Sequence, residues 1–180
     1  MILTIELPDR SQTAAETLRR WDEICNDPNY ANFPGRVESN FNGNVVLNPP
    51  PSFSHSIRTS RIISELTKRI GGMALPECAV LTADGVKGID VGWMTEEELR
   101  RRGDQTVCDP APPICIEVLS PSNRASEMRS KRALYFDAGA KECWECDQDG
   151  RMHFYLSDTT TAVQQSILCP DFPPVLGATP

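Results

Sequence analysis

The stretch ICIEVLSP, residues 114–121, is an apolar strand with a single carboxylate, Glu117, in its middle. Alternation along a strand puts Glu117 on the same face as Cys115 and Leu119, which are both apolar. A carboxylate between apolar neighbours costs free energy unless a cation, a metal ion or hydrogen-bond donors replace its lost hydration. Glu117 therefore marks either a site that holds a ligand or a strand near a sheet edge, where the carboxylate reaches water or an arginine.

A second apolar segment also carries a lone acid. In GIDVGW, residues 88–93, Asp90 stands between Ile89 and Val91. An acid inside such a strand favours a second site residue, whereas an aspartate soon after Gly88 is also typical of a turn. Both interpretations stay open for this segment by itself.

A lysine on the next helix bears on both acids. Residues 124–138 have helical periodicity, and Met128, Lys131, Tyr135 and Ala138 fall on one face of that helix. Lys131 thus lies on the stripe that faces the interior, although a lysine can also extend from such a position to solvent. An inward lysine would bring its ammonium group near the two strand carboxylates.

Two strand carboxylates and one inward lysine are the parts of a metal-dependent nuclease site. Asp90 and Glu117 offer the hard oxygen ligands that Mg²⁺ prefers, and water and phosphate oxygens would complete its shell. Such a metal lowers the pKa of its bound water and neutralises charge on the phosphate. Lys131 would orient the water or stabilise the charge of the transition state.

The rest of the chain predicts one mixed α/β domain. Helices are expected at residues 14–25, 55–70 and 124–138, and strands at 36–40, 44–47, 78–82, 89–94, 114–119, 142–146, 152–156 and 162–168. This order predicts an α/β fold of α+β-like character, in which helices flank a mixed β-sheet. We expect a single domain over residues 1–180, with its core at about 13–169.

Three local predictions concern turns and loops. Asn42-Gly43 indicates a two-residue type I′ turn between the first two strands. The polar, proline-rich segment 100–113 is expected to be an exposed excursion, and the proline-rich tail 170–180 is expected to be loose.

Composition excludes several classes of protein. Seven scattered cysteines, an odd number, do not form a disulfide framework and fit a reducing cytoplasm. In CWEC, residues 143–146, the two cysteines would face opposite sides of a strand, so they cannot share a zinc ion. A net charge of −7 argues against a protein that coats nucleic acid, but it leaves room for a local basic cleft. With no apolar run able to span a bilayer and no signal-peptide features, we expect a cytoplasmic protein.

Several short motifs, in order along the chain, resemble one family of nucleases. The matching blocks are Arg36-Val37-Glu38 before Asn42-Gly43, Pro49-Pro50 leading to His55, Ile89-Asp90-Val91, Glu117-Val118-Leu119-Ser120-Pro121-Ser122, Lys131 with Tyr135, Ala138-Gly139-Ala140 and Cys143-Trp144. With this run, which covers about residues 13–156, the chain resembles the Uma-type family of bacterial restriction endonucleases, a branch of the PD-(D/E)XK nuclease superfamily.

The resemblance implies a restriction-endonuclease-like fold and a set of site residues. It implies that Asp90, Glu117, Lys131 and Glu38 are catalytic, with Asp90 and Glu117 as ligands of Mg²⁺ and Mn²⁺ as a substitute. In this branch the lysine is relocated to the helix, and Leu119 stands two residues after the glutamate instead. DNA is the implied substrate, no membrane partner is expected, and the chain could form a homodimer.

Two positions depart from the family pattern: Ile89 replaces a proline before Asp90, and Asn123 stands where an acid is common. His55 could assist catalysis or simply begin a helix. The leading hypothesis is a metal-dependent endonuclease that hydrolyses DNA. The alternative is a catalytically inactive relative that acts as a binding or regulatory module, and the residues do not decide between DNA and RNA as the polymer.

Overall fold

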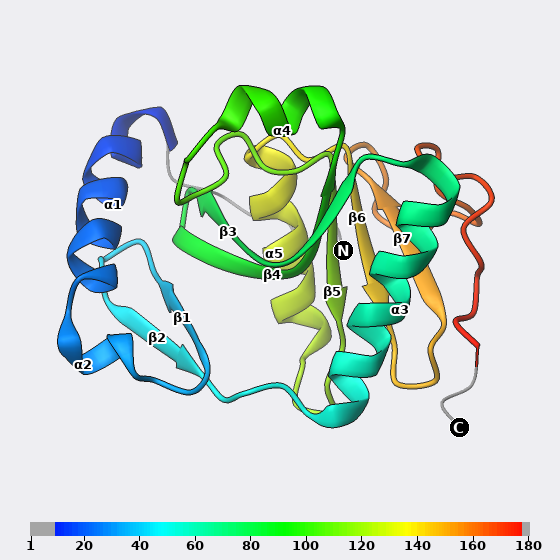
Figure 1. Cartoon of the computed structure of the whole chain (residues 1–180), viewed down its shortest axis with the longest axis horizontal. Helices are drawn as coiled ribbons and strands as arrows, with labels where there is room; N and C mark the ends of the chain where they lie inside the picture. Colours follow the sequence, from blue (N-terminus) through cyan, green and yellow to red (C-terminus); the bar gives the residue numbers. More distant parts are fainter. Residues whose placement is uncertain (1–9, 178–180) are drawn as a thin grey trace.

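The computed structural model of the protein describes residues 10–177 (Figure 1). Its centre is a five-stranded sheet in the order β3-β4-β5-β6-β7. Its strands are β3 (Met73–Thr82), β4 (Gly85–Met94), β5 (Ile114–Val118), β6 (Glu142–Cys146) and β7 (Met152–Leu156). β5 and β6 run parallel, and all other neighbours in this sheet are antiparallel. The predicted α/β fold with a mixed sheet is therefore confirmed.

Helices cover both faces of this sheet (Figure 1). α3 (Phe53–Ile70) packs on one face through Ile62 and Leu66. α5 (Ala125–Asp137) lies on the other face, where Tyr135 packs among side chains of the strands. Parallel neighbours need a crossover connection, and α5 supplies it between β5 and β6. A short helix, α4 (Glu96–Arg102), follows β4.

An N-terminal layer packs beside β3 and β4. It consists of α1 (Arg10–Cys25), α2 (Pro28–Ala31) and a hairpin of β1 (Arg36–Ser39) and β2 (Val45–Asn48). Trp21 and Ile24 of α1 are buried together with Leu81 and Val86 of the sheet. β1 contacts β4, so the hairpin lies beside the strand that carries Asp90.

Local sequence explains where α3 begins and ends. The side chain of Ser52, the N-cap residue, accepts a hydrogen bond of 3.3 Å from the backbone N–H of His55. Gly71 ends the helix with a φ of 63°, a left-handed conformation that glycine adopts at little cost. The cap therefore fixes His55 in the first turn, which faces the site described below.

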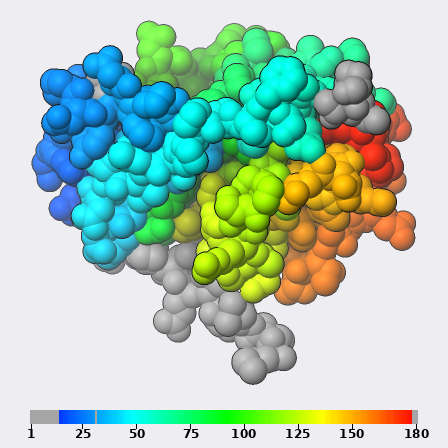
Figure 2. All heavy atoms as spheres, turned by 90° about the horizontal axis from the view of Figure 1, so that it is seen from below, coloured from blue at the N-terminus to red at the C-terminus, as the bar shows by residue number. Residues whose placement is uncertain are grey.

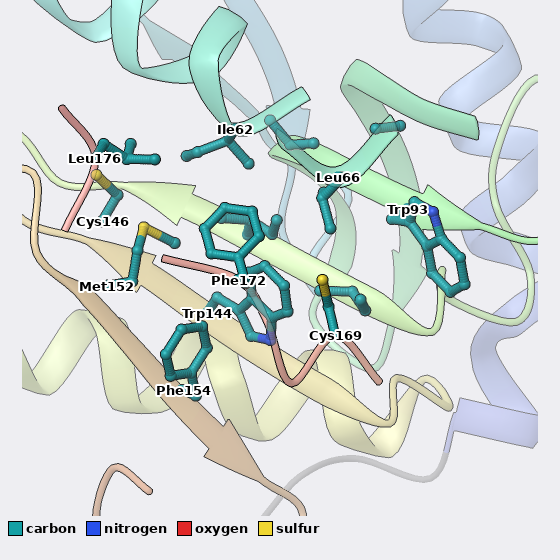
Figure 3. Close-up of a cluster of buried hydrophobic side chains, with 14 of the residues drawn as sticks. Ile62, Leu66, Trp93, Trp144, Cys146, Met152, Phe154, Cys169, Phe172 and Leu176 are labelled. Atoms are coloured by element: carbon teal, nitrogen blue, oxygen red, sulfur yellow. The ribbon is translucent and has the colours of Figure 1, made fainter. Parts of the chain in front are cut away.

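Trp144 of β6 lies at the centre of the main core (Figure 3). Its ring centroid is 5.0 Å from that of Phe154, edge to face, and 4.8 Å from that of Phe172. Its indole N–H donates a hydrogen bond of 2.7 Å to the Glu142 carboxylate, so the only polar atom of its side chain is satisfied.

We expect Trp144→Ala to lower the free energy of unfolding by about 3–5 kcal/mol, because it leaves a large cavity between three elements. Urea denaturation monitored by circular dichroism measures this change. Phe53→Ala is the control, since 82% of Phe53 is exposed, and its effect should stay within about 0.5 kcal/mol. Equal losses in the two variants would contradict the assignment of Trp144 as the centre of the core.

The tail was predicted wrongly as far as residue 177. Phe172 and Leu176 are each only 4% exposed and belong to the main core (Figure 3). The backbone N–H of Met152 donates to the Pro174 carbonyl at 2.8 Å, which ties the tail to β7. Prolines prevent regular structure here, but the apolar residues between them still gain by burial.

Three further local predictions need correction. The segment 100–113 is not simply exposed, because Val107 and Ala111 are buried. A strand at 162–168 is reduced to one bridge between Val163 and Phe154. The first hairpin turns through a three-residue loop rather than a type I′ turn: Asn40 and Asn44 close it by a backbone hydrogen bond, and of its residues only Gly43 has positive φ.

No helix within residues 10–177 is long and apolar enough to cross a membrane.

Candidate active site

Asp90 lies on β4 where the pairing with β5 ends. The last paired residues are Val91 and Ile116, and continuing the antiparallel register places Asp90 opposite Glu117, one residue beyond the last pair. Oδ2 of Asp90 accepts a hydrogen bond of 2.7 Å from the backbone N–H of Val118. This side-chain contact replaces the ladder at this point and directs the Asp90 carboxylate toward the end of β5.

Two basic side chains from other elements hold the Asp90 carboxylate. Nη1 of Arg36 on β1 donates to Oδ1 at 2.8 Å, and Nε2 of His55 on α3 lies 3.0 Å from Oδ2. Burial alone would raise the pKa of Asp90, but the hydrogen bond from His55 and the charge of Arg36 outweigh it and hold that pKa below its usual value. The hydrogen bond to Asp90 in turn raises the pKa of His55.

Glu117 is held by two residues of α5. Nζ of Lys131 donates to Oε1 at 3.3 Å, and the hydroxyl of Tyr135 donates to the same oxygen. Burial raises the pKa of Glu117 against the opposing charge of Lys131, and the nearby Asp90 raises it further. Within the described part of the chain, Oε2 of Glu117 has no hydrogen-bond partner, so one carboxylate oxygen is available to a ligand.

Glu38 approaches the same place from the hairpin. Its Oε1 accepts a hydrogen bond of 3.2 Å from the backbone N–H of Gly88 and lies 3.3 Å from Nε of Arg36. On the other side, Glu77 of β3 lies 3.7 Å from Nη1 of Arg36 and has a φ of 55°, which is rare for a residue with a side chain. Carboxylates from three different strands, those of Glu38, Glu77 and Asp90, therefore surround one guanidinium group.

The four predicted site residues thus form one charged cluster. Asp90 and Glu38 share Arg36, and Lys131 pairs with Glu117, which faces Asp90. His55, for which both a site role and a helix-start role were open, begins α3 and also contacts Asp90. Asn123 accepts hydrogen bonds from Ser120 within the β5–α5 loop and does not extend the cluster.

The contacts of Arg36 and Tyr135 within the site were not predicted. Arg36 and Glu38 alternate on a short strand, so they share a face, and Tyr135 follows Lys131 by one helical turn. These spacings could have indicated shared environments. They could not have indicated which carboxylate each residue meets, because the partners come from distant segments.

The cluster fits a divalent metal by its chemistry, although a guanidinium now lies among the oxygens. Asp90 and Glu117 supply the carboxylate oxygens that Mg²⁺ prefers. Within residues 10–177, no three side chains of the ligand types are already gathered as a metal cage. Figure 2 shows the β1–β2 hairpin (light blue to cyan) and the start of α5 (yellow-green), two of the segments that carry or adjoin the cluster residues, on one face of the molecule. The carboxylate donors are thus present, and the guanidinium group of Arg36 lies among them.

The contact between His55 and Asp90 predicts a pH-dependent stability of the metal-free protein. Because the folded-state pKa of His55 is raised, its contribution is complete below the unfolded-state value of about 6.5 and is lost as pH rises through the folded-state value. The stability difference between wild type and His55→Gln, measured by urea denaturation in EDTA, should therefore be largest below about pH 6.5 and shrink as the pH rises above it. A difference that stays constant with pH would contradict this.

Comparison with known proteins shows the family to which the chain belongs. No curated protein matches the chain. A solved structure titled a putative nuclease belonging to DUF820, from Anabaena variabilis ATCC 29413, has the same fold, with a TM-score of 0.60 and 20% identity. The match covers 71% of this chain and 75% of that one. The profile of the Uma2 family, described as "Putative restriction endonuclease", matches residues 18–175. This match covers most of the chain, so the protein belongs to the Uma2 family.

Proposed function

We propose that this protein is a metal-dependent endonuclease that hydrolyses phosphodiester bonds of DNA, with Mg²⁺ as its metal and Mn²⁺ as a substitute. The observation that carries the proposal is the facing pair of Asp90 and Glu117, with Lys131 bonded to Glu117. Membership of the Uma2 family supports a nuclease. The carboxylate donors support a hard divalent cation.

Each residue of the cluster has a role in this proposal. Asp90 and Glu117 would hold the metal, which supplies an activated water and neutralises charge on the phosphate. Tyr135 and Lys131 both donate to Oε1 of Glu117, so they would orient that ligand and leave Oε2 toward the metal. Glu38 would act as an additional acid at the edge of the site, held in place by Gly88.

Hydrolysis forms a bond between a water oxygen and phosphorus and breaks the bond from phosphorus to one sugar oxygen. The proton of the water leaves to solvent or a nearby base, and the released sugar oxygen gains a proton. Lys131 would stabilise the added negative charge, because its ammonium group lies 3.3 Å from Oε1 of Glu117, one of the two proposed metal ligands.

Cleavage of supercoiled plasmid DNA tests the proposal. Wild-type protein should nick or linearise the plasmid with Mg²⁺ or Mn²⁺ and should be inactive in EDTA, and either metal at millimolar concentration should raise its melting temperature. A parallel reaction with single-stranded RNA distinguishes the two polymers. A protein that neither cleaves nor gains thermal stability from metal would instead be an inactive, nuclease-fold binding or regulatory module.

A further inference from the structure

Arg36 lies against Asp90, one of the two proposed metal ligands. Its guanidinium group bonds Asp90 and lies beside Glu38 and Glu77, and the charge of Glu117 also acts on it. We propose that Arg36 is the resident counter-ion of this site, which the divalent metal displaces and which then binds a phosphate of the nucleic-acid substrate. This inference rests on the proposed function and assigns Arg36 a part in it.

The carboxylates need a cation when no metal is bound. Glu38 and Asp90 are buried, and like charges held together in the interior repel strongly unless a positive charge separates them. Arg36 is the residue that contacts both, through Nε near Glu38 and Nη1 on Asp90. Its presence therefore stabilises the metal-free fold.

The same position opposes metal binding. Nη1 of Arg36 lies on Oδ1 of Asp90, while Oδ2 already accepts from His55 and from the backbone of Val118. A divalent ion bound through Oδ1 would meet a full positive charge at close range. The N–H of Val118 belongs to the backbone of β5 and cannot move away from Asp90. The flexible side chain of Arg36 is therefore the group that a metal ion on Oδ1 must displace.

The Arg36 side chain is only partly enclosed and not fully hydrogen-bonded. Its side chain is 22% exposed, so part of it already contacts solvent. Its Nε is buried yet lacks a properly aligned hydrogen bond, although Glu38 lies 3.3 Å away. Space for the side chain depends on Gly88, because a Cβ at that position would lie 2.3 Å from Cδ of Arg36.

A displaced Arg36 would be well suited to bind substrate. Guanidinium groups bind phosphate oxygens through two parallel hydrogen bonds, and they keep their charge at any accessible pH. The side chain comes from β1 of the hairpin, which borders the face seen in Figure 2. A swing of the guanidinium toward solvent would thus carry it to where a nucleic-acid backbone can approach the carboxylates.

Metal affinity distinguishes this role from a purely structural one. We would measure Mn²⁺ binding by calorimetry, without DNA, for wild type and Arg36→Met. Removing a competing charge should tighten Mn²⁺ binding by about tenfold or more. The metal-free variant should also melt at a lower temperature than wild type, and Mn²⁺ should raise its melting temperature more. If Arg36 had only a structural role, its loss would instead disorder the metal ligands and weaken Mn²⁺ binding.

A second variant keeps the test decisive if Arg36→Met does not fold. Gly88→Ala leaves all charges in place but pushes the Arg36 side chain out of its seat, so it should also tighten Mn²⁺ binding. Arg132→Met is the matched control, because it breaks a buried arginine pair with Glu145 on β6, beyond the proposed ligands. Its Mn²⁺ affinity should equal that of wild type.

Substrate binding tests the second half of the inference. With Ca²⁺ in place of the catalytic metal, Arg36→Met should bind duplex DNA more weakly, and the slope of log K against log salt should fall by about 0.9, the value for one lost phosphate contact. If wild type binds Mn²⁺ and neither Arg36→Met nor Gly88→Ala binds it more tightly, only the role assigned to Arg36 is overturned. No Mn²⁺ binding by any of the proteins overturns the proposed function as well.

Discussion

Replacing Lys131 with methionine should lower the rate of DNA cleavage by about 10²–10³-fold without disrupting the fold. The ammonium group is the nearest positive charge to Glu117 and would stabilise charge on the phosphate during reaction. Methionine keeps a similar length and packs readily on the inner face of α5. The rate is measured by single-turnover cleavage of plasmid with Mg²⁺.

Metal binding and stability separate this effect from a folding defect. Lys131 is not a metal ligand, so the Mn²⁺ affinity of Lys131→Met should stay within a few-fold of wild type. Loss of the ammonium leaves Glu117 with the Tyr135 hydroxyl as its hydrogen-bond donor, which should cost some stability of the metal-free protein. Lys141→Met, at an exposed position after α5, is the control and should cleave normally. A Lys131→Met protein that cleaves at the wild-type rate would contradict a catalytic role.

Glu117→Gln should abolish both cleavage and the thermal shift caused by metal. The amide keeps the size of the side chain and an oxygen for Lys131 and Tyr135, but it removes the negative charge that a divalent ion needs from its ligand. We expect the cleavage rate to fall by more than about 10³-fold. The rise in melting temperature with millimolar Mg²⁺ or Mn²⁺ should disappear.

Glu145→Gln is a closely matched control for this change. Glu145 lies beside Glu117 in the parallel register of β6, is also buried, and pairs with its own cation of α5, Arg132. Both variants lose a buried ion pair on the same face of the sheet, so their losses of stability should be similar. Glu145→Gln should still cleave DNA and respond to metal. Equal loss of activity in both would indicate that Glu117 acts only through stability.

Much of the fold followed from local patterns in the sequence. β6 and β7 were predicted with the observed bounds, Glu142–Cys146 and Met152–Leu156, and α5 within one residue at each end. Alternation and helical periodicity report which face of an element is buried, and the sheet and its helices bury those faces. The tail failed because its apolar residues have no regular period, and only the completed core provides the surface on which they pack.

For the candidate site, too, part was predictable from the sequence and part only from the structure. The sequence alone indicated Asp90, Glu117 and Lys131 as the candidate site charges, because an acid or a lysine on an apolar face interrupts a regular pattern, and only the structure showed that these side chains meet inside the fold. Only the tertiary structure decided how these charges are compensated. Arg36 reaches Asp90 from 54 residues away along the chain, and His55 reaches it from the first turn of α3, 35 residues away. The energy between two charges depends on their distance in space. Local sequence patterns carry no information on the distance between segments that meet only after folding.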